Sequence, residues 1–265
     1  MVLRSQQEKQ RVEDIIVRNK MTAYSLSVVI PVYNEEDCIE ETLAKIQEFL
    51  NVRFQDYEIL VVDDGSDDGT YLKVKALAEK NKRIQLFKND RNSGKGFSVK
   101  RGMLAATSDF VLFMDADCST PVEEIMKFVP YFSQDIDILL GSRVLKESNV
   151  LKRQGVIRRS LGRLFNCLIQ IFLFQGVQDT QCGFKCFKRQ AAQKLFKLQT
   201  IQRYCFDAEI LFLARKRNCT IKEIPITWVN RKNSRLGIIK DAPKMLSDLL
   251  KIRWNDWKGI YADSR

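Results

Sequence analysis

Nearly continuous apolar runs alternate with helical patterns along the first 145 residues. Each run predicts a β-strand, and the runs fall at 26–34, 57–64, 83–90, 109–117 and 135–144. Between them apolar residues recur at helical spacing, and we expect helices over 37–50, 71–81, 94–106 and 121–132. Strands that are apolar throughout are typical of parallel sheets covered on both faces. The pattern therefore predicts an α/β fold with a Rossmann-like, mostly parallel sheet covered by helices.

The character of the chain changes after Val144. The segment 146–176 is basic and loop-like at first and then becomes an amphipathic helix, while 179–230 returns to compact α/β patterning. No repeat or low-complexity tract interrupts the sequence. We expect one catalytic domain over 25–236, which includes the 146–176 segment, preceded by an extension over 1–24 and followed by a helical tail over 237–265.

The composition of the chain limits the partners and the catalytic mechanisms that it can have. The 265 residues carry a formal net charge of +11, which favours a polyanionic partner such as nucleic acid, a phosphorylated substrate or an anionic membrane. The absence of histidine excludes Ser-His and Cys-His nucleophilic catalysis and the common zinc sites. Any metal must then be a hard cation held mainly by oxygen ligands. The seven scattered cysteines are interpreted as free thiols in a reducing compartment.

Polar clusters follow four of the predicted strands, and in an open parallel sheet ligands bind beyond the carboxyl ends of the strands. The clearest cluster is "FMDAD", where Asp115 and Asp117 end an apolar strand. Alternate side chains of an extended strand point the same way, so both carboxylates can face one Mg²⁺ or Mn²⁺ ion. The alternative is that these acids only cap a helix that begins near Pro121. That alternative leaves the second acidic strand end, at Asp63 and Asp64, unexplained.

Two further motifs lie at the same predicted edge. In "VVDDGSDDGT" the glycines predict a turn, and we expect Asp63 and Asp64 to accept a hydrogen bond from a base or ribose. "NSGKGFSVKRG" resembles a phosphate-binding loop without the full Walker spacing, and its Lys95 is a candidate phosphate ligand.

Taken together, "SVVIPVYNEE", "ILVVDDGSDDGT", "NSGKGFSVKRGM", "MDADCSTP" and "GSRV" resemble the family 2 inverting glycosyltransferases with the GT-A fold. These stretches cover about the first 145 residues and are highly specific as a set. Later stretches, "DTQCGFKCFKR", "RYCFDAEILFLA" and "EIPITWVNRKNSRL", are similar to the polyprenyl-phosphate sugar synthases of that family, most of all to its dolichyl-phosphate β-glucosyltransferases.

The resemblance implies a role for each matching residue. The nucleotide pocket would comprise Pro31, Tyr33, Glu35, Asp64 and Lys95. Asp115 and Asp117 would hold the metal and the diphosphate, and Arg143 would hold a phosphate. The sugar and acceptor side would be lined by Asp179, Gln181, Asp207 and Glu209, with the acceptor phosphate also met by Arg158, Arg159 and Arg163. The implied reaction transfers glucose from UDP-glucose to dolichyl or another polyprenyl phosphate, with Mg²⁺ or Mn²⁺ as cofactor.

A polyprenyl phosphate presents its reactive end at a membrane surface, where basic residues next to a short apolar helix suit an interfacial position. The 146–176 segment has this character, although a buried helix with a solvated basic start is the alternative. No apolar run reaches the ~18 residues that span a bilayer. The eukaryotic relatives are expected to begin with a transmembrane helix, which this chain does not show. We therefore expect a peripheral enzyme on the cytosolic face of the endoplasmic reticulum, or on the cytoplasmic membrane of a prokaryote.

We weighed three alternatives to this function against the sequence. A dolichyl-phosphate mannosyltransferase, or another polyprenyl-phosphate sugar synthase, would differ only in its donor. A basic nucleic-acid-binding protein would explain the charge, but no helix-turn-helix, zinc-finger or RNA-recognition signature is present. A Rossmann dehydrogenase is disfavoured because no G-x-G-x-x-G follows the first strand.

Overall fold

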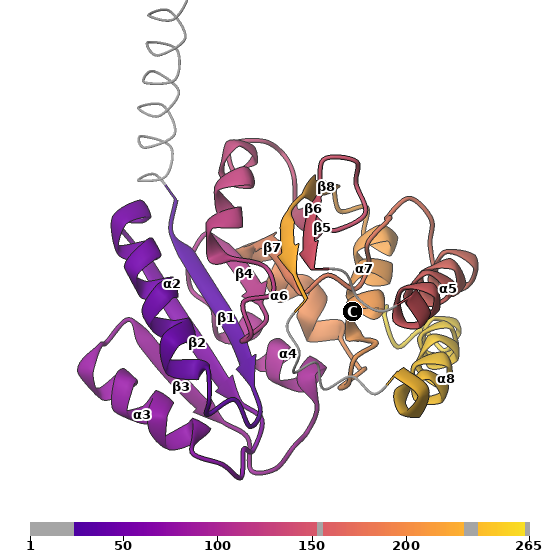
Figure 1. Cartoon of the computed structure of the whole chain (residues 1–265). Helices are drawn as coiled ribbons and strands as arrows, with labels where there is room; N and C mark the ends of the chain where they lie inside the picture. Colours follow the sequence, from indigo (N-terminus) through magenta and orange to yellow (C-terminus); the bar gives the residue numbers. More distant parts are fainter. Residues whose placement is uncertain (1–23, 153–155, 231–237, 263–265) are drawn as a thin grey trace, which may run out of the picture.

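The computed structural model describes residues 24–152, 156–230 and 238–262. Within these ranges seven strands form one mixed sheet with the order β3-β2-β1-β4-β7-β5-β8, flanked by helices (Figure 1). The strands are β1 (Leu26–Val32), β2 (Tyr57–Asp63), β3 (Ile84–Lys88), β4 (Phe110–Met114), β5 (Ile138–Ser142), β7 (Phe184–Lys188) and β8 (Ile221–Pro225). The GT-A-like α/β prediction is confirmed at this level.

All neighbouring strands in the sheet are parallel except at β7, which runs antiparallel to both β4 and β5. This reversed strand separates the β1–β4 half of the sheet from the β5–β8 half. The segment that enters β7 therefore arrives at the same edge as the carboxyl ends of its neighbours. A small second sheet is formed by β6 (Asn149–Lys152) and β9 (Thr227–Val229). Its strand β6 lies at the start of the 146–176 segment, where the sequence indicated a loop.

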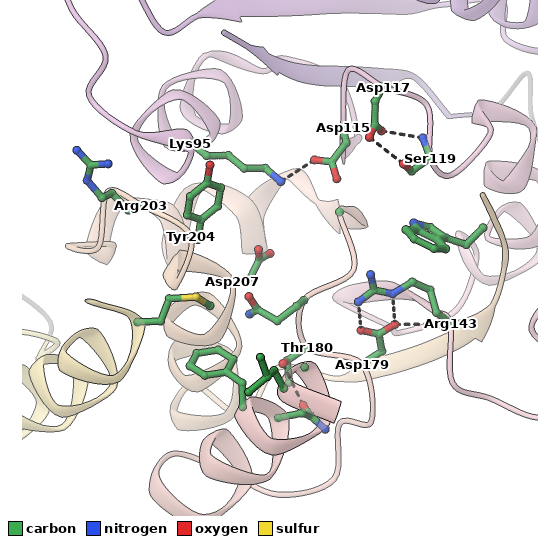
Figure 2. Close-up of a pocket in the computed structure, with 18 of the residues that line it drawn as sticks. Lys95, Asp115, Asp117, Ser119, Arg143, Asp179, Thr180, Arg203, Tyr204 and Asp207 are labelled. Carbon is green, nitrogen blue, oxygen red and sulfur yellow. Dashed lines mark hydrogen bonds and ion pairs between the residues drawn. The ribbon is translucent and has the colours of Figure 1, made fainter. Parts of the chain in front are cut away.

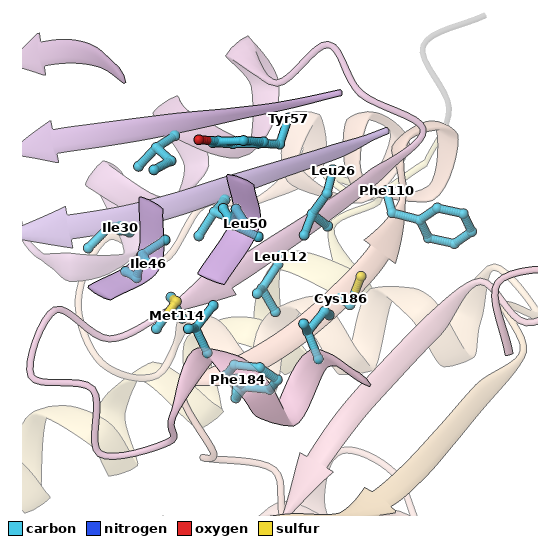
Figure 3. Packing of buried hydrophobic residues seen from close by; sticks show 14 of the residues in the cluster. Leu26, Ile30, Ile46, Leu50, Tyr57, Phe110, Leu112, Met114, Phe184 and Cys186 are labelled. Carbon is cyan, nitrogen blue, oxygen red and sulfur yellow. The ribbon is translucent and has the colours of Figure 1, made fainter. Parts of the chain in front are cut away.

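Helices cover both faces of the sheet, which explains why successive strand residues such as Val28 and Val29 are both fully buried. One face packs against α2 (Ile39–Arg53), α3 (Thr70–Lys80) and the 3₁₀ turn η1 (Val122–Lys127), and Figure 3 shows part of this cluster. The other face packs against α4 (Lys95–Ala105), α6 (Arg189–Leu198) and α7 (Phe206–Lys216). The apolar runs of the sequence are unbroken because a strand that is covered on both faces has no side chain facing solvent.

The segment after Pro121 is not the α-helix that its pattern predicted. It forms two 3₁₀ turns, η1 and η2 (Val129–Tyr131), with i→i+3 bonds such as Phe128 N to the Ile125 carbonyl. Pro130 opposes an α-helix here, because proline has no N–H to complete the α-helical bond to the Met126 carbonyl.

Two further helices, α5 (Val156–Phe172) and α8 (Ile238–Trp257), pack against each other at one end of the sheet (Figure 1). The helical pattern of the 146–176 segment and the helical tail are thus confirmed as helices. The predicted 1–24 extension lies almost entirely outside the described residues. No helix in the described ranges has the length and apolarity needed to cross a bilayer.

Candidate active site

A cavity of about 1520 Å³ opens at the carboxyl edge of the sheet. Its polar wall comes from the ends of β1, β2, β4 and β5, the segment that enters β7, and the start of α7. The opposite wall comes from α5 and α8 and is mostly apolar, with Arg163 and Asn166 of α5 as its polar residues. Every residue predicted for the nucleotide pocket lines this cavity: Pro31, Tyr33, Glu35, Asp64 and Lys95.

The acidic pair follows β4 directly. Ser119 orients Asp117, because its backbone N–H and its hydroxyl each donate to the carboxylate at 2.8 Å. Burial raises the pKa of Asp117, and the adjacent Asp115 carboxylate raises it further. Two carboxylates held this close repel each other when both are ionised, so the arrangement favours a cation between them. Lys95 already contacts one of them, with its Nζ 2.6 Å from Asp115 Oδ1 (Figure 2).

Gly183, just before β7, makes room for the Asp115 carboxylate. A Cβ atom at Gly183 would lie only 2.1 Å from Asp115 Oδ2, well inside van der Waals contact. The Asp115 side chain can rotate away from such a clash, but its carboxylate would then leave its position beside Lys95.

We expect Gly183→Ala to lower turnover by roughly tenfold or more. Displacement of a catalytic group by about 1 Å can lower the reaction rate ~10²-fold. The melting temperature should change little, since the clash falls on a rotatable side chain. Steady-state kinetics and thermal melting measure the two effects. Gly162→Ala is the matched control: Gly162 also lines the cavity but has open space where its Cβ would lie. Equal loss in both variants would contradict the assignment.

Arg143, after β5, is held by the segment entering β7. Its Nε and Nη2 bind the Asp179 carboxylate at 2.8 and 2.7 Å, and Asp179 also accepts the Arg143 backbone N–H. Burial lowers the pKa of Arg143, but the Asp179 carboxylate more than reverses this and raises it. Glu223 in turn accepts the backbone N–H groups of Gln178 and Asp179. The guanidinium carbon also lies over the Trp228 ring, 5.6 Å from its centroid, which is within cation–π range.

A third ion pair of the site is buried and joins β7 to α7. Lys185 on β7 and Asp207 on α7 are both almost fully buried, with Nζ 2.5 Å from Oδ1. Lys185 also donates to the Cys182 carbonyl, so its ammonium is satisfied from two sides. Burial raises the pKa of Asp207 and Lys185 opposes that rise. Asp207 faces the cavity (Figure 2), whereas sequence reasoning overlooked Lys185 because a lysine on a strand is ordinarily a solvent-facing residue.

The remaining predicted residues divide into three groups. Gln181 and Arg163 line the cavity. Arg158 and Arg159 belong to α5, but their side chains lie outside the described residues. Glu209 is a correction, because it is fully buried and does not line the cavity. It accepts hydrogen bonds from Thr200, from the Ile201 N–H and from the Tyr261 hydroxyl, and so ties α7 to the chain end beyond α8.

Asp64 lines the cavity and also holds a neighbouring loop. Its carboxylate accepts the Ser93 and Gly94 backbone N–H groups and the Asn89 side-chain amide. It therefore shapes the glycine-containing loop that begins α4, and Gly94 adopts φ +104°, which favours glycine. Sequence reasoning missed Arg203, Tyr204 and Trp228 as cavity residues. The motif "RYCFDAE" contained the first two, but only Asp207 and Glu209 were singled out in it.

Comparison with known proteins agrees with this architecture. The Glycosyl transferase family 2 model matches residues 27–196. A dolichyl-phosphate β-glucosyltransferase of Dictyostelium discoideum is 35% identical, over 92% of this chain and 78% of that protein. The enzyme of the same name from Saccharomyces cerevisiae is also 35% identical, over 91% and 77%.

Among solved structures, glucosyl-3-phosphoglycerate synthase from Mycobacterium tuberculosis with UDP superimposes with a TM-score of 0.65 at 19% identity, covering 89% of this chain and 82% of that one. The same enzyme with Mn²⁺, UDP-glucose and phosphoglyceric acid gives 0.63 at 18%, with the same coverage. At this identity the likeness shows the fold. Together with the family match and the curated relatives, it means that the chain belongs to glycosyl transferase family 2 and, within it, groups with the dolichyl-phosphate β-glucosyltransferases.

Proposed function

We propose that the protein transfers glucose from UDP-glucose to dolichyl phosphate, or a related polyprenyl phosphate, with inversion, and so produces dolichyl β-D-glucosyl phosphate. The observation that carries the proposal is a single cavity that holds an acidic pair, an oriented arginine and an apolar wall. Its volume of about 1520 Å³ exceeds the ~300–1,000 Å³ of ordinary ligand pockets. A donor and part of a lipid acceptor can therefore bind together. The names of the relatives supply the substrate pair.

Asp115 and Asp117 are the residues that would hold a divalent metal. Their donor set fits Mg²⁺ or Mn²⁺, which take carboxylate oxygens together with waters and substrate phosphate oxygens. No group of three or more potential acidic, cysteine or histidine ligands exists among the described residues, which agrees with a site completed by the substrate. The neighbour solved with Mn²⁺ and UDP-glucose supports the same choice. A bound ion would neutralise the charge that develops on the UDP leaving group.

The protein's own residues then position the reactants. An acceptor phosphate oxygen attacks the anomeric carbon of glucose, and the bond from that carbon to the UDP oxygen breaks on the opposite face. The nucleophile is already an anion, so no strong general base is required, in accord with a chain without histidine. Lys95, whose ammonium lies at Asp115, is placed to meet the diphosphate. The contribution of the protein is orientation and charge neutralisation.

Arg143 is our candidate for the acceptor phosphate. Asp179 occupies its Nε and Nη2, which leaves Nη1 to meet a ligand in the cavity. The same cavity has a mostly apolar wall, which includes Leu161, Phe165 and Leu168 of α5 and Met245 of α8. Prenyl units that follow the phosphate would find apolar contacts there.

Asp179→Asn tests this arrangement. Without the carboxylate, Arg143 loses its bidentate partner and its fixed orientation, so we expect KM for the acceptor to rise roughly tenfold or more while KM for UDP-glucose stays near its original value. Initial rates at varied acceptor and donor concentrations separate the two constants. Asp135→Asn serves as control, because its carboxylate is exposed and pairs with Lys188 far from the cavity lining. A rise confined to the donor KM would count against the acceptor assignment.

The acceptor is a membrane lipid, so we place the enzyme at a bilayer surface, peripherally on the cytosolic face of the endoplasmic reticulum. Mg²⁺ and Mn²⁺ both suit the proposed site. A mannosyltransferase acting on the same acceptor is the alternative donor assignment. No observation favours nucleic acid as a partner.

A donor panel decides between these assignments. The protein is incubated with dolichyl phosphate in vesicles, Mg²⁺ or Mn²⁺, and radiolabelled UDP-glucose, GDP-mannose or another UDP-sugar. We expect a glucolipid from UDP-glucose alone, with the β configuration by NMR. Transfer from GDP-mannose in preference would replace the donor, and absence of any lipid-linked sugar would overturn the proposed function.

A further inference from the structure

The outer side of α8 carries an apolar ridge that the described part of the chain leaves exposed. Leu246, Leu250, Trp254 and Trp257 follow one another at spacings of four, four and three residues, and all are exposed, Trp257 by 77%. The inward side of the same helix is buried through Leu249 and Ile252, so packing within the protein is already satisfied there. The two indole rings lie 5.1 Å apart. A row of large apolar side chains that the packing of the protein leaves exposed is typical of an interaction surface.

The partner helix α5 extends this surface. Leu164, Ile171 and Phe172 are exposed on it, and α5 packs against α8 (Figure 1). Leu164 of α5 and Leu246 of α8 are exposed and also line the large cavity. The ridges of both helices therefore start at the cavity mouth, where a lipid acceptor would have to enter.

Cations flank the ridge on α8. Lys244 and Lys251, with Ser247, line a polar pocket of about 370 Å³ together with Arg203, which also reaches the large cavity. Lys258 lies over the Trp254 ring at 4.8 Å. Acids are present too, but Asp256 is paired with Lys216 and Asp248 is one carboxylate among three cations of the polar pocket. Apolar and aromatic side chains beside cations complement an anionic lipid surface, with rings at the headgroup level and cations at lipid phosphates.

We propose that α8 is a second membrane-contact helix, which joins α5 in a platform around the cavity mouth and seats its Trp254–Trp257 pair in an anionic leaflet. The inference rests on the proposed function for its orientation, since the platform brings the cavity to the lipid that carries the acceptor phosphate. Sequence patterning assigned membrane contact to 146–176 alone and left the tail without a role.

Vesicle binding tests the platform directly. The full chain and the variant Trp254→Ala/Trp257→Ala are sedimented with vesicles of phosphatidylcholine alone or with added phosphatidylserine. We expect the wild type to bind the anionic vesicles and the variant to bind them at least roughly tenfold more weakly. Val52→Ala/Leu72→Ala removes two equally exposed apolar residues from α2 and α3 and should bind like the wild type. Unchanged binding by the tryptophan variant would overturn the proposal.

Tryptophan fluorescence gives a second readout. The chain has three tryptophans, and the third, Trp228, is 9% exposed. Quenching by lipids brominated in the acyl chain should therefore report Trp254 and Trp257, and lack of quenching in bound protein would contradict their insertion. Light scattering tests whether a second copy of the chain occupies the ridge instead. If the wild type formed a stable dimer and the tryptophan variant stayed monomeric, a second copy would cover the ridge and the membrane proposal would be overturned.

Acceptor length separates this proposal from the proposed function. With a short, water-soluble prenyl phosphate, the tryptophan variant should turn over like the wild type, while with dolichyl phosphate in anionic vesicles it should be at least tenfold slower. Equal slowing on both acceptors would overturn the platform and leave the glucosyltransferase assignment intact. A wild type that binds vesicles but glucosylates neither acceptor would overturn the proposed function and leave vesicle binding intact.

Discussion

Replacement of Asp117 by alanine is expected to lower glucosyl transfer by about 10²–10³-fold or more, because loss of one charge-stabilising group in an active site costs about that much. In the proposed metal site both carboxylates hold the cation, and Asp115 is already engaged by Lys95. The variant should keep its fold, since among the described residues the only backbone group that donates to Asp117 is the Ser119 N–H, two residues away. Initial rates at saturating Mn²⁺ measure the effect, and electron paramagnetic resonance of Mn²⁺ with UDP measures the metal site independently.

The raised pKa of Asp117 predicts the direction in which a substitution changes the stability of the protein. Burial, together with Asp115, raises the pKa of Asp117 above its value in the unfolded chain. The folded state therefore holds this proton more tightly, so ionisation at neutral pH opposes folding. Asp117→Asn removes that cost and should melt at or above the wild-type temperature in metal-free buffer. Asp67→Ala, at an exposed acid outside the cavity lining, is the activity control. Full turnover of Asp117→Ala with saturating metal would contradict the assignment of Asp117 to the metal site.

Lys185→Met is expected to destabilise the protein by about 3–5 kcal/mol, because removal of one member of a buried ion pair leaves the other charge uncompensated. Asp207 would lose its nearest cation while staying 5% exposed. Urea unfolding followed by circular dichroism measures the loss. In Lys185→Met/Asp207→Asn both charges are gone, so the double variant should lose less than the single one.

Lys188→Met is the matched control for this experiment. Lys188 lies on the same strand, but its partner Asp135 is 99% exposed, and surface pairs contribute about 0–1 kcal/mol. Equal destabilisation by both methionine substitutions would show that burial of the Lys185–Asp207 pair does not increase its contribution to stability. Activity adds a second readout, since Asp207 faces the cavity and the double variant reveals what its charge contributes there.

The local pattern determined most of the elements and much of the site. Unbroken apolar runs predicted the parallel strands, because a strand covered on both faces has no polar side. The acids after β4 and the arginine after β5 were found because ligands bind at the carboxyl edge of parallel strands. These signals depend on residue type and spacing over a few positions, so one sequence contains them in full.

The tertiary structure alone decided which remote segments meet. The reversed strand β7 carries Asp179 to Arg143, Gly183 to Asp115 and Lys185 to Asp207. Nothing in the local pattern of "FKCFK" states its direction or its neighbours, because an apolar strand pairs through backbone groups that every residue shares. For the same reason the β6–β9 pairing, the structural position of Glu209 and the shared ridge of α5 and α8 emerged only when side chains distant in sequence were packed together.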